Sequence, residues 1–308
     1  MCARPGCAPP SIRPILPRTE GKFDAARDIR IDRPDHATIA AALAPRGGCG
    51  HVTGVILRPP RLLVPFAFAV LAPVPASAQD VAPPSPLTLS GSADVFSQYR
   101  FRGLSRSDGE PAVQGDLELS HVSGVYGGLT VTSESPGPAL DYGHAEVDLY
   151  AGYDHALGSS GLRVDLGLRG YIYADRAGKN LVELSAALDR QIGPVDLRAG
   201  LAYAPPQRVA PASTARDNTY LFAEGRSDIP GTPLSLHAHL GHTAGSLDYT
   251  GPYWDYRLGL TASHKAFGLD LSLVGTSVSH AAALATPDPA ATWRAARSAG
   301  VITVSYQF

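Results

Sequence analysis

Charged side chains recur at every second position in several stretches of this sequence. Arg163, Asp165 and Arg169 stand in one such stretch, and Asp196 and Arg198 stand in another. Acidic and basic groups spaced in this way could pair with one another and fill a narrow interior, or form opposed rings that set charge selectivity where a polar passage narrows. The full set of pore-lining candidates is Glu146, Asp148, Tyr150, Arg163, Asp165, Arg169, Glu183, Asp196 and Arg198.

The histidines form a second set of candidates, because imidazoles bind metal ions and act as catalytic bases. His237 and His239 project to the same face, with His242 beyond them, so a metal site is conceivable. Spaced polar residues on one face explain the pattern equally well, and we predict no metal site and no cofactor. Neighbouring Ser and His residues, such as Ser120 and His121, point to opposite faces and cannot form a nucleophile–base pair. We therefore predict no catalytic residue and no enzymatic activity.

Three arginines form a third set, the outer-loop candidates Arg100, Arg102 and Arg106, and they lie close to Asp108 and Glu110. A loop of this composition could fold into the interior of a barrel or meet anionic lipopolysaccharide. It could also stay in solvent with its charges paired to one another. The sequence leaves these three outcomes open.

The elements that would position these side chains are β-strands. Leu162, Val164 and Leu166 alternate with polar or small residues, and the same period of two recurs from residue 87 onward. Period two sends successive side chains to opposite faces, so each stretch predicts a strand with one apolar and one polar face. The twelve predicted strands are 87–100, 112–122, 125–133, 145–156, 162–173, 181–192, 195–203, 218–228, 234–243, 254–265, 269–279 and 299–308.

The links between these strands alternate between long and short. The links 134–144 and 280–298 are long, for example, whereas 123–124 and 193–194 are minimal. This alternation is typical of outer-membrane barrels, which have short periplasmic turns and longer external loops. A soluble sandwich or a lipocalin-type barrel would also show period two. We predict an all-β fold, a twelve-stranded antiparallel transmembrane outer-membrane β-barrel with both termini on the periplasmic side.

The last predicted strand ends the chain with alternating apolar residues. Ile302, Val304 and Tyr306 lie on one face, and Phe308 is the terminal residue. Such an ending looks like the signal read by the machinery that assembles barrels in the outer membrane. We therefore assign Tyr306 and Phe308 to an assembly signal and expect that machinery to be a partner.

The segment before the predicted strands has a different composition. Residues 1–78 carry ten Lys and Arg against five Asp and Glu, and the rest carries sixteen against twenty-three, so the two parts hold about +5 and −7. Arg58 and Arg61 precede an apolar run at 62–72, and Pro-Ala-Ser-Ala follows at 75–78, which is the pattern of a secretory signal peptide. We predict a signal peptide at 58–78 and a barrel at 79–308. Residues 1–57 are then an extension that is disordered or precedes the true translation start.

The composition of the whole chain excludes several classes of protein. Its formal net charge is −2, so no strongly basic face is implied and we expect no nucleic-acid partner. Charged residues make up 18%, below the usual value for soluble globular proteins. All three cysteines lie in residues 1–78, so the predicted barrel has no thiol chemistry.

Tyrosines are frequent near the ends of the predicted strands. Outer-membrane barrels carry girdles of aromatic residues at the two membrane interfaces. We therefore expect these tyrosines to form such girdles rather than ordinary core contacts. They are Tyr99, Tyr126, Tyr153, Tyr171, Tyr173, Tyr203, Tyr220, Tyr256 and Tyr306.

Several runs of residues are shared with a known family. The first reads LSGSADVFSQYRFRGLSRSDG at 89–109. Shorter runs follow in order, AVQG at 112–115, EVDLYAGY at 146–153, VEL at 182–184, DNTY at 217–220 and WDY at 254–256. With these runs the segment 87–308 resembles the TorF-type family of porins of Gram-negative bacterial outer membranes. The resemblance implies an outer-membrane barrel classed as a porin, with no substrate, cofactor or catalytic residue to carry over. The usual Tyr-rich segment after the fifth strand is reduced here to Tyr171-Ile172-Tyr173.

Together these observations predict a porin-like channel for passive diffusion of small solutes, exported to the bacterial outer membrane. The acidic balance of residues 79–308 favours cations or neutral solutes. Outer-membrane lipids, lipopolysaccharide and the small solutes themselves are the remaining expected partners. A non-conducting structural or adhesive barrel and a lipid-modifying barrel enzyme are the alternatives.

Overall fold

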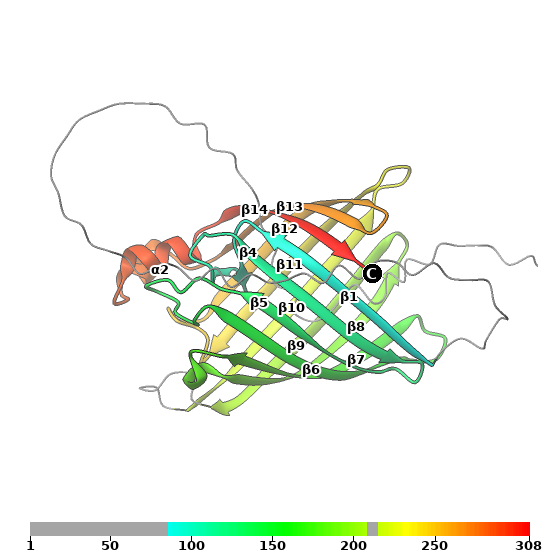
Figure 1. The fold of residues 1–308 in the computed structure, drawn as a ribbon, viewed down its shortest axis with the longest axis horizontal. Coiled ribbons are helices and arrows are strands. Elements are labelled where there is room, and N and C mark those ends of the chain that lie inside the picture. The colour runs from blue at the N-terminus through cyan, green and yellow to red at the C-terminus, as the bar shows by residue number, and fades with distance from the viewer. Residues whose placement is uncertain (1–85, 208–214) are drawn as a thin grey trace, which may run out of the picture.

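Strands that follow one another in the sequence lie side by side and close into an antiparallel β-barrel (Figure 1). The computed structural model describes residues 86–207 and 215–308. The first and last strands pair to close the barrel, and Gly91 and Phe308 exchange two backbone hydrogen bonds of 3.1 Å. In the described part of the chain the barrel strands are β1 (Leu87–Phe96), β4 (Ala112–His121), β5 (Val125–Ser133), β6 (Ala145–Ala156), β7 (Leu162–Tyr173), β8 (Leu181–Ile192), β9 (Val195–Gln207), β10 (Arg216–Asp228), β11 (Leu234–Gly245), β12 (Tyr253–His264), β13 (Phe267–Thr276) and β14 (Ala299–Gln307).

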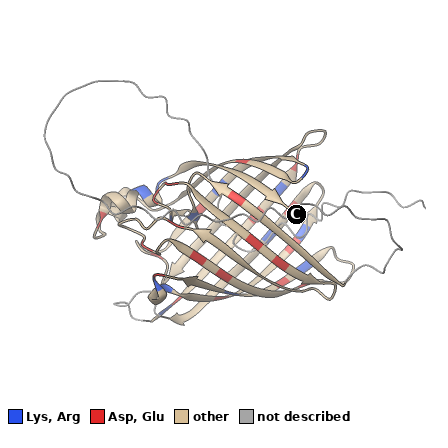
Figure 2. Cartoon of the chain, in the orientation of Figure 1, with Lys and Arg blue, Asp and Glu red and all other residues tan. Residues whose placement is uncertain are grey.

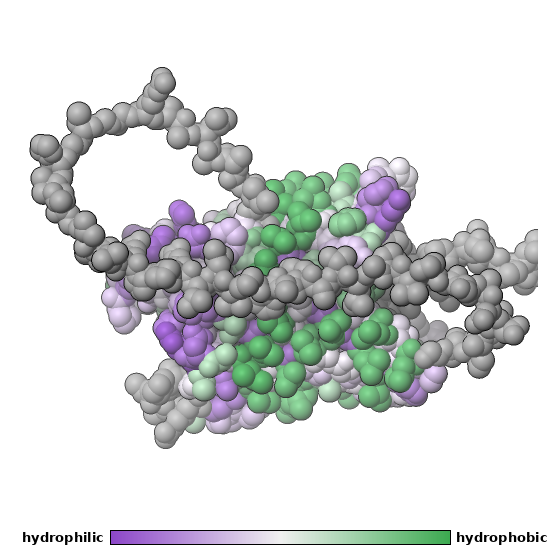
Figure 3. All heavy atoms as spheres, viewed as in Figure 1, coloured by the Kyte–Doolittle hydropathy of each residue, from purple (hydrophilic) through white to green (hydrophobic). Residues whose placement is uncertain are grey.

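Most of the leucines in the strands point outward. Leu166 and Leu258 are typical, with 49% and 60% of their surface exposed. On the face shown in Figure 3 such residues form a green band between two ends that are richer in polar residues. A soluble protein would bury these side chains, whereas the outer face of a transmembrane barrel carries them as an apolar band.

The polar residues of the same strands point inward and are buried. Asp165, Glu183 and Arg198 are each less than a tenth exposed. The strand register brings opposite charges together, because Asp189 stands beside Arg163 on one neighbouring strand and beside Arg198 on the other. Charged residues therefore follow the strands between the two ends of the barrel (Figure 2).

The two ends of the barrel differ in structure. Short turns connect the strands at one end, where β1 begins and β14 ends (Figure 1). The long links lie at the other end and hold the short helices η1 (Ala177–Lys179), α1 (His280–Leu284) and α2 (Pro289–Ala296). No helix in the described ranges is long and apolar enough to cross a membrane. We call the end with the long links the outer end and the other the short-turn end.

The predicted fold class is confirmed, because twelve antiparallel strands close into a barrel and their bounds agree with the predicted ones to within a few residues. The largest differences are in β1, which ends at Phe96 rather than at residue 100, and in β9, which ends at Gln207 rather than at residue 203. The link 280–298 contains two helices, which the alternation did not predict. The predicted extension at 1–57 and the signal peptide at 58–78 lie outside the described residues.

Candidate functional site

The first loop of the outer end, residues 97–111, folds into the barrel. It contains a small hairpin made of β2 (Arg100–Phe101) and β3 (Leu104–Ser105). Its two turn residues, Arg102 and Gly103, have φ angles of +48° and +77°, which are the left-handed values required by the tight turns of β-hairpins. All residues from Tyr99 to Ser107 are buried. We refer to residues 97–111 as the plug loop.

The tip of the plug loop reaches the far walls of the barrel. The guanidinium of Arg102 donates to both carboxylate oxygens of Glu183 on β8, at 2.8 and 3.0 Å. It also lies 4.0 Å from the ring centroid of Tyr220 on β10. Gly103 packs so tightly that a Cβ atom there would lie 2.7 Å from the carbonyl oxygen of Gly275 on β13. The plug loop therefore spans the lumen from β1 to the opposite strands.

A second anchor holds the base of the plug loop. Nη1 of Arg106 lies 2.5 Å from a carboxylate oxygen of Glu146 on β6, and Tyr99 donates to the other oxygen at 2.8 Å. The guanidinium of Arg106 stacks 4.1 Å from the ring centroid of Tyr142. Charge-assisted hydrogen bonds of this kind are about twice as strong as neutral ones, and burial strengthens them further.

Glu134, which immediately follows β5, lies beside this second anchor. Its side chain is fully buried and neither carboxyl oxygen makes a hydrogen bond, although Oε1 is 3.6 Å from Nη1 of Arg106. Burial, reinforced by the nearby charge of Glu146, raises the pKa of Glu134 to about 9. The carboxyl group is therefore protonated at neutral pH.

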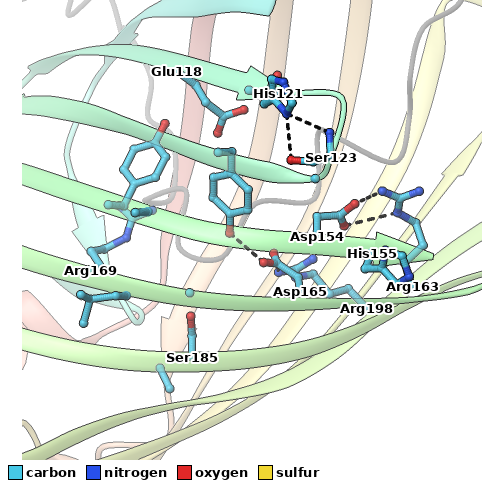
Figure 4. A pocket seen from close by; sticks show the side chains of 18 of the residues that line it. Glu118, His121, Ser123, Asp154, His155, Arg163, Asp165, Arg169, Ser185 and Arg198 are labelled. Atoms are coloured by element: carbon cyan, nitrogen blue, oxygen red, sulfur yellow. Dashed lines mark hydrogen bonds and ion pairs between the residues drawn. The ribbon is translucent and has the colours of Figure 1, made fainter. Parts of the chain in front are cut away.

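The half of the lumen toward the short-turn end contains a cavity of about 320 Å³. His121, Ser123 and Ala156 at the short turns form its mouth, and Tyr171 and Glu183 form its inner end. Figure 4 shows the side chains of several lining residues projecting from neighbouring strands into this space. Its charged and tyrosine residues are Glu118, Asp154, Arg163, Asp165, Arg169, Glu183, Arg198, Tyr126, Tyr150 and Tyr171.

Each arginine of the cavity is held by carboxylates on neighbouring strands, one or two strands away in the barrel. Arg163 pairs with Asp154, and Arg169 donates to Asp148 at 2.9 Å (Figure 4 shows the first pair). The other arginine of the cavity, Arg198, pairs with two carboxylates, one from β7 and one from β8. Its distances are 2.7 Å to Asp165 and 2.8 Å to Asp189. These pairs fix the charges of the cavity wall in place.

The two histidines of β11 belong to separate clusters. His237 lies 2.5 Å from Asp270, which also accepts from Arg257 at 2.8 Å. His239 lies between Glu224 at 2.9 Å and Asp255 at 3.1 Å. In residues 86–207 and 215–308 no three His, Cys, Asp or Glu side chains gather as they would to hold a metal ion.

The nine pore-lining candidates all lie on the interior face of the barrel. Asp148 and Arg169 pair with each other, as do Asp165 and Arg198, whereas Glu146 and Glu183 bind the plug loop. Whether these residues line an open path remains a prediction. The candidates of the assembly signal, Tyr306 and Phe308, are on the outer face of β14 or beyond its end and are about half exposed.

Of the three outcomes left open for the plug loop, the structure shows insertion into the barrel. Arg102 and Arg106 pair mainly with Glu183 and Glu146 of the barrel wall, and not with Asp108 and Glu110 of their own loop. Arg100 is also buried, and its Nη1 donates to the carbonyl of Gly103 at 2.6 Å.

The expectation of aromatic girdles is wrong for five of the nine tyrosines. Their side chains lie inside the barrel, where their hydroxyl groups bond to acidic residues or to arginine. Tyr171 and Tyr173 stand in phase with Arg169 on β7, so the alternation already placed them inside. The five are Tyr99, Tyr126, Tyr171, Tyr173 and Tyr220.

The sequence analysis did not identify several interior residues as parts of the site, because their spacing did not indicate which residues they would contact. Tyr220 and Glu224 share the interior face of β10, a parity that the sequence contained. Glu134 and Tyr142 lie in a predicted link, and nothing in their spacing indicated that they would be buried against Arg106.

Comparison with known proteins gives one match in sequence and several in structure. A sequence model of the Gcw_chp family, described as a bacterial protein of unknown function, matches residues 80–306. None of the curated proteins compared with the chain matches it.

The structural matches are distant and include different kinds of barrel. An outer-membrane channel from Pseudomonas putida F1 has 16% identity and a TM-score of 0.43, with 74% of this chain and 99% of that one covered. A porin has 12% identity and a TM-score of 0.36, with 72% and 100% covered. LpxR from Salmonella typhimurium has 11% identity and a TM-score of 0.38, with 71% and 99% covered.

Proposed function

The chain belongs to the Gcw_chp family of bacterial proteins of unknown function, and we propose that it is a channel through which small solutes diffuse passively. The barrel lies in the bacterial outer membrane in this proposal, with the short-turn end toward the periplasm. The resemblance of residues 87–308 to TorF-type porins points the same way. The chain acts on no covalent bond of its solutes.

The observation that supports this proposal best is the way the lumen is closed. Barrels of eight strands fill their interiors with strand side chains, whereas those of sixteen or more enclose water, so twelve strands leave space to be filled. At the short-turn end that space is a cavity lined by charged residues. At the outer end the plug loop enters this space, where Arg102 and Arg106 bind the wall and side chains of the other long links pack against it. Inward-folded loops and opposed charges are what a channel needs for a selective constriction.

The surroundings that we propose follow from the outer face. Its apolar band suits the acyl chains of outer-membrane lipids, and the long links at the outer end would face lipopolysaccharide. Export would use the signal peptide at 58–78. Tyr306 and Phe308 would be recognised by the barrel assembly machinery.

Planar-bilayer recording of the purified barrel tests the proposal directly. We expect ohmic current steps, and larger steps from Arg102→Gly, in which the plug loop loses its bond to Glu183. Heat-unfolded protein in the same detergent is the control. Silence of both variants over many insertions would contradict the channel and favour a non-conducting structural or adhesive barrel.

The same preparation separates the enzyme alternative. A lipid-modifying enzyme needs a nucleophile, a base and a carboxylate near the membrane rim, whereas His239 with Glu224 and Asp255 lies inside the barrel. We expect no release of fatty acid from phospholipid or lipid A. Turnover that is lost in His239→Ala would contradict the proposal.

A further inference from the structure

Arg102 of the plug loop sits in a pocket that has the features of a binding site for a guanidinium ion. Glu183 accepts two hydrogen bonds from it, at 2.8 and 3.0 Å. The rings of Tyr220 and Phe101 lie against the guanidinium, at 4.0 and 4.8 Å from their centroids. Both hydrogen bonds come from Nη2 of Arg102. A carboxylate and aromatic faces are the groups by which proteins recognise such cations.

The carboxylate that holds Arg102 is also part of the cavity wall. Glu183 lies at the inner end of the cavity, next to Tyr171, whose hydroxyl donates to Oε2 of Glu183 at 3.0 Å. A solute that enters from the short-turn end therefore meets, at the end of its path, the group to which Arg102 is bound.

The charge of the cavity favours a cationic solute. Its three arginines are each held by carboxylates, two of which, Asp148 and Asp189, stand outside the lining. Carboxylates therefore outnumber arginines in the cavity and its immediate surroundings, and the electrostatic potential attracts cations. The four carboxylates of the lining itself are Glu118, Asp154, Asp165 and Glu183.

The backbone of Arg102 is strained in the position in which its side chain bonds to Glu183. Arg102 has a φ of +48°, a left-handed value that costs a residue with a Cβ atom free energy. The bonds to Glu183 offset this cost while Arg102 is seated. A competing cation on Glu183 would remove that compensation and release the tip of the loop.

We infer that the cavity is the solute site of the proposed channel, and that its solutes are small organic cations with a guanidinium or primary ammonium group that take the place of Arg102 on Glu183. The inference rests on the proposed function, because it names the solutes of that channel. Binding of such a cation and opening of the plug loop are then one exchange reaction, in which one cation replaces another on the same carboxylate.

Binding of propylguanidinium to the full barrel in detergent, followed by saturation-transfer NMR, tests the inference. We expect weak binding to the wild type and binding at least ten times tighter to Arg102→Gly, because glycine adopts the left-handed φ freely and leaves Glu183 to the probe. Adding Glu183→Gln to Arg102→Gly should weaken binding at least tenfold. Asp228→Asn, which removes an exposed carboxylate at the short-turn end, should change nothing. Circular dichroism melting shows that each variant is folded.

Two further probes and a current measurement separate the possible failures. Butylammonium should bind like propylguanidinium, and butyrate, an anion of similar size, should not bind. Equal binding of butyrate, or an unchanged affinity in the doubly substituted variant, overturns the cation site even if the barrel conducts. Cation binding that depends on Glu183, in a barrel that carries no current, overturns the channel and leaves the site in place.

Discussion

The two halves of the lumen are closed by different means. In the half toward the short turns, arginines and carboxylates of the strands themselves pair with one another, as Arg198 of β9 does with Asp189 of β8 and Asp165 of β7, and a cavity remains between the walls. In the outer half the arginines come from the plug loop and the carboxylates from the wall. A strand residue cannot leave the barrel without unfolding it, but a loop can. The same chemistry therefore stabilises the wall in one half and a removable part in the other.

The largest effect should come from breaking the pairs of the cavity wall. In the double variant Asp165→Ala, Asp189→Ala, Arg198 is left buried without the two carboxylates that hold it. An uncompensated buried charge costs about 3–5 kcal/mol. We expect the free energy of unfolding in detergent and lipid to fall by that amount, as measured by urea titration. The triple variant that also carries Arg198→Leu should recover most of the lost free energy of unfolding. A loss below about 1 kcal/mol in the double variant would mean that the charge pairs do not stabilise the cavity wall, and the two halves of the lumen would not differ as described.

A substitution on the outer face should lower the free energy of unfolding without acting on either half of the lumen in particular. It therefore serves as a reference for the substitutions inside the barrel. Leu166 points outward and is half exposed. Leu166→Arg places a charge near the middle of the apolar band, which costs about 2–4 kcal/mol if that face meets lipid. Leu166→Ala removes the side chain without adding a charge and is the matched control. Equal unfolding free energies for the two variants in lipid would count against the membrane assignment.

The third prediction concerns the tip of the plug loop. Gly103→Val introduces a Cβ atom that meets the carbonyl of Gly275, at a φ that β-branched residues avoid. The tip of the plug loop must then move away from the barrel wall, so we expect the single-channel current to rise several-fold. The loss in unfolding free energy, about 1–2 kcal/mol, is limited by the free energy that separates the open from the closed barrel. Gly109→Val, in the same loop at a similar φ of +83° but with open space around it, is the control that carries the backbone strain without the contact. An unchanged current with a loss above about 3 kcal/mol would mean that the loop is a fixed part of the wall.

The strands could be predicted from the sequence because the period of two is a local property. Leu162, Val164 and Leu166 assign β7 and its outward face without knowledge of any other strand. The parity also placed Tyr171 and Tyr173 inside, but the expectation of interfacial girdles ignored their phase with Arg169. The alternation predicts which face of the sheet a side chain occupies, but it does not predict which side chains it contacts across the lumen.

The position of the plug loop inside the barrel could not be predicted, because its contacts join residues that are far apart in the chain. Arg102 and Glu183 are separated by 81 positions, and Arg106 and Glu146 by 40. Nearby Asp108 and Glu110 offered shorter and equally charged alternatives. The choice depends on the width of the closed barrel, which no single segment encodes. Helix α2 was within reach of local reasoning, because Asp288 and Pro289 are a typical N-cap and first helical residue.

The last prediction is a dependence of closure on pH, which only the outer half can show. Burial beside Arg106 and Glu146 raises the pKa of Glu134 to about 9, and departure of the plug loop would return that pKa toward its usual value near 4.5. The closed barrel then binds the proton more tightly than the open one between these two values. Closure is strongest below about pH 4.5 and weakens as the pH rises toward 9, because the open barrel can release the proton and the closed one cannot.

Glu134→Gln separates this contribution from other titrations of the barrel. The amide keeps the shape and has no proton to release, so closure of this variant should not weaken between pH 5 and 8, whereas closure of the wild type should weaken steadily over that range. The measurement is the open fraction of single channels against pH, with the charge pairs of the cavity wall unchanged in both proteins. If both proteins showed the same slope, the buried carboxyl would not respond to the loop, and the outer half would be as fixed as the wall of the cavity.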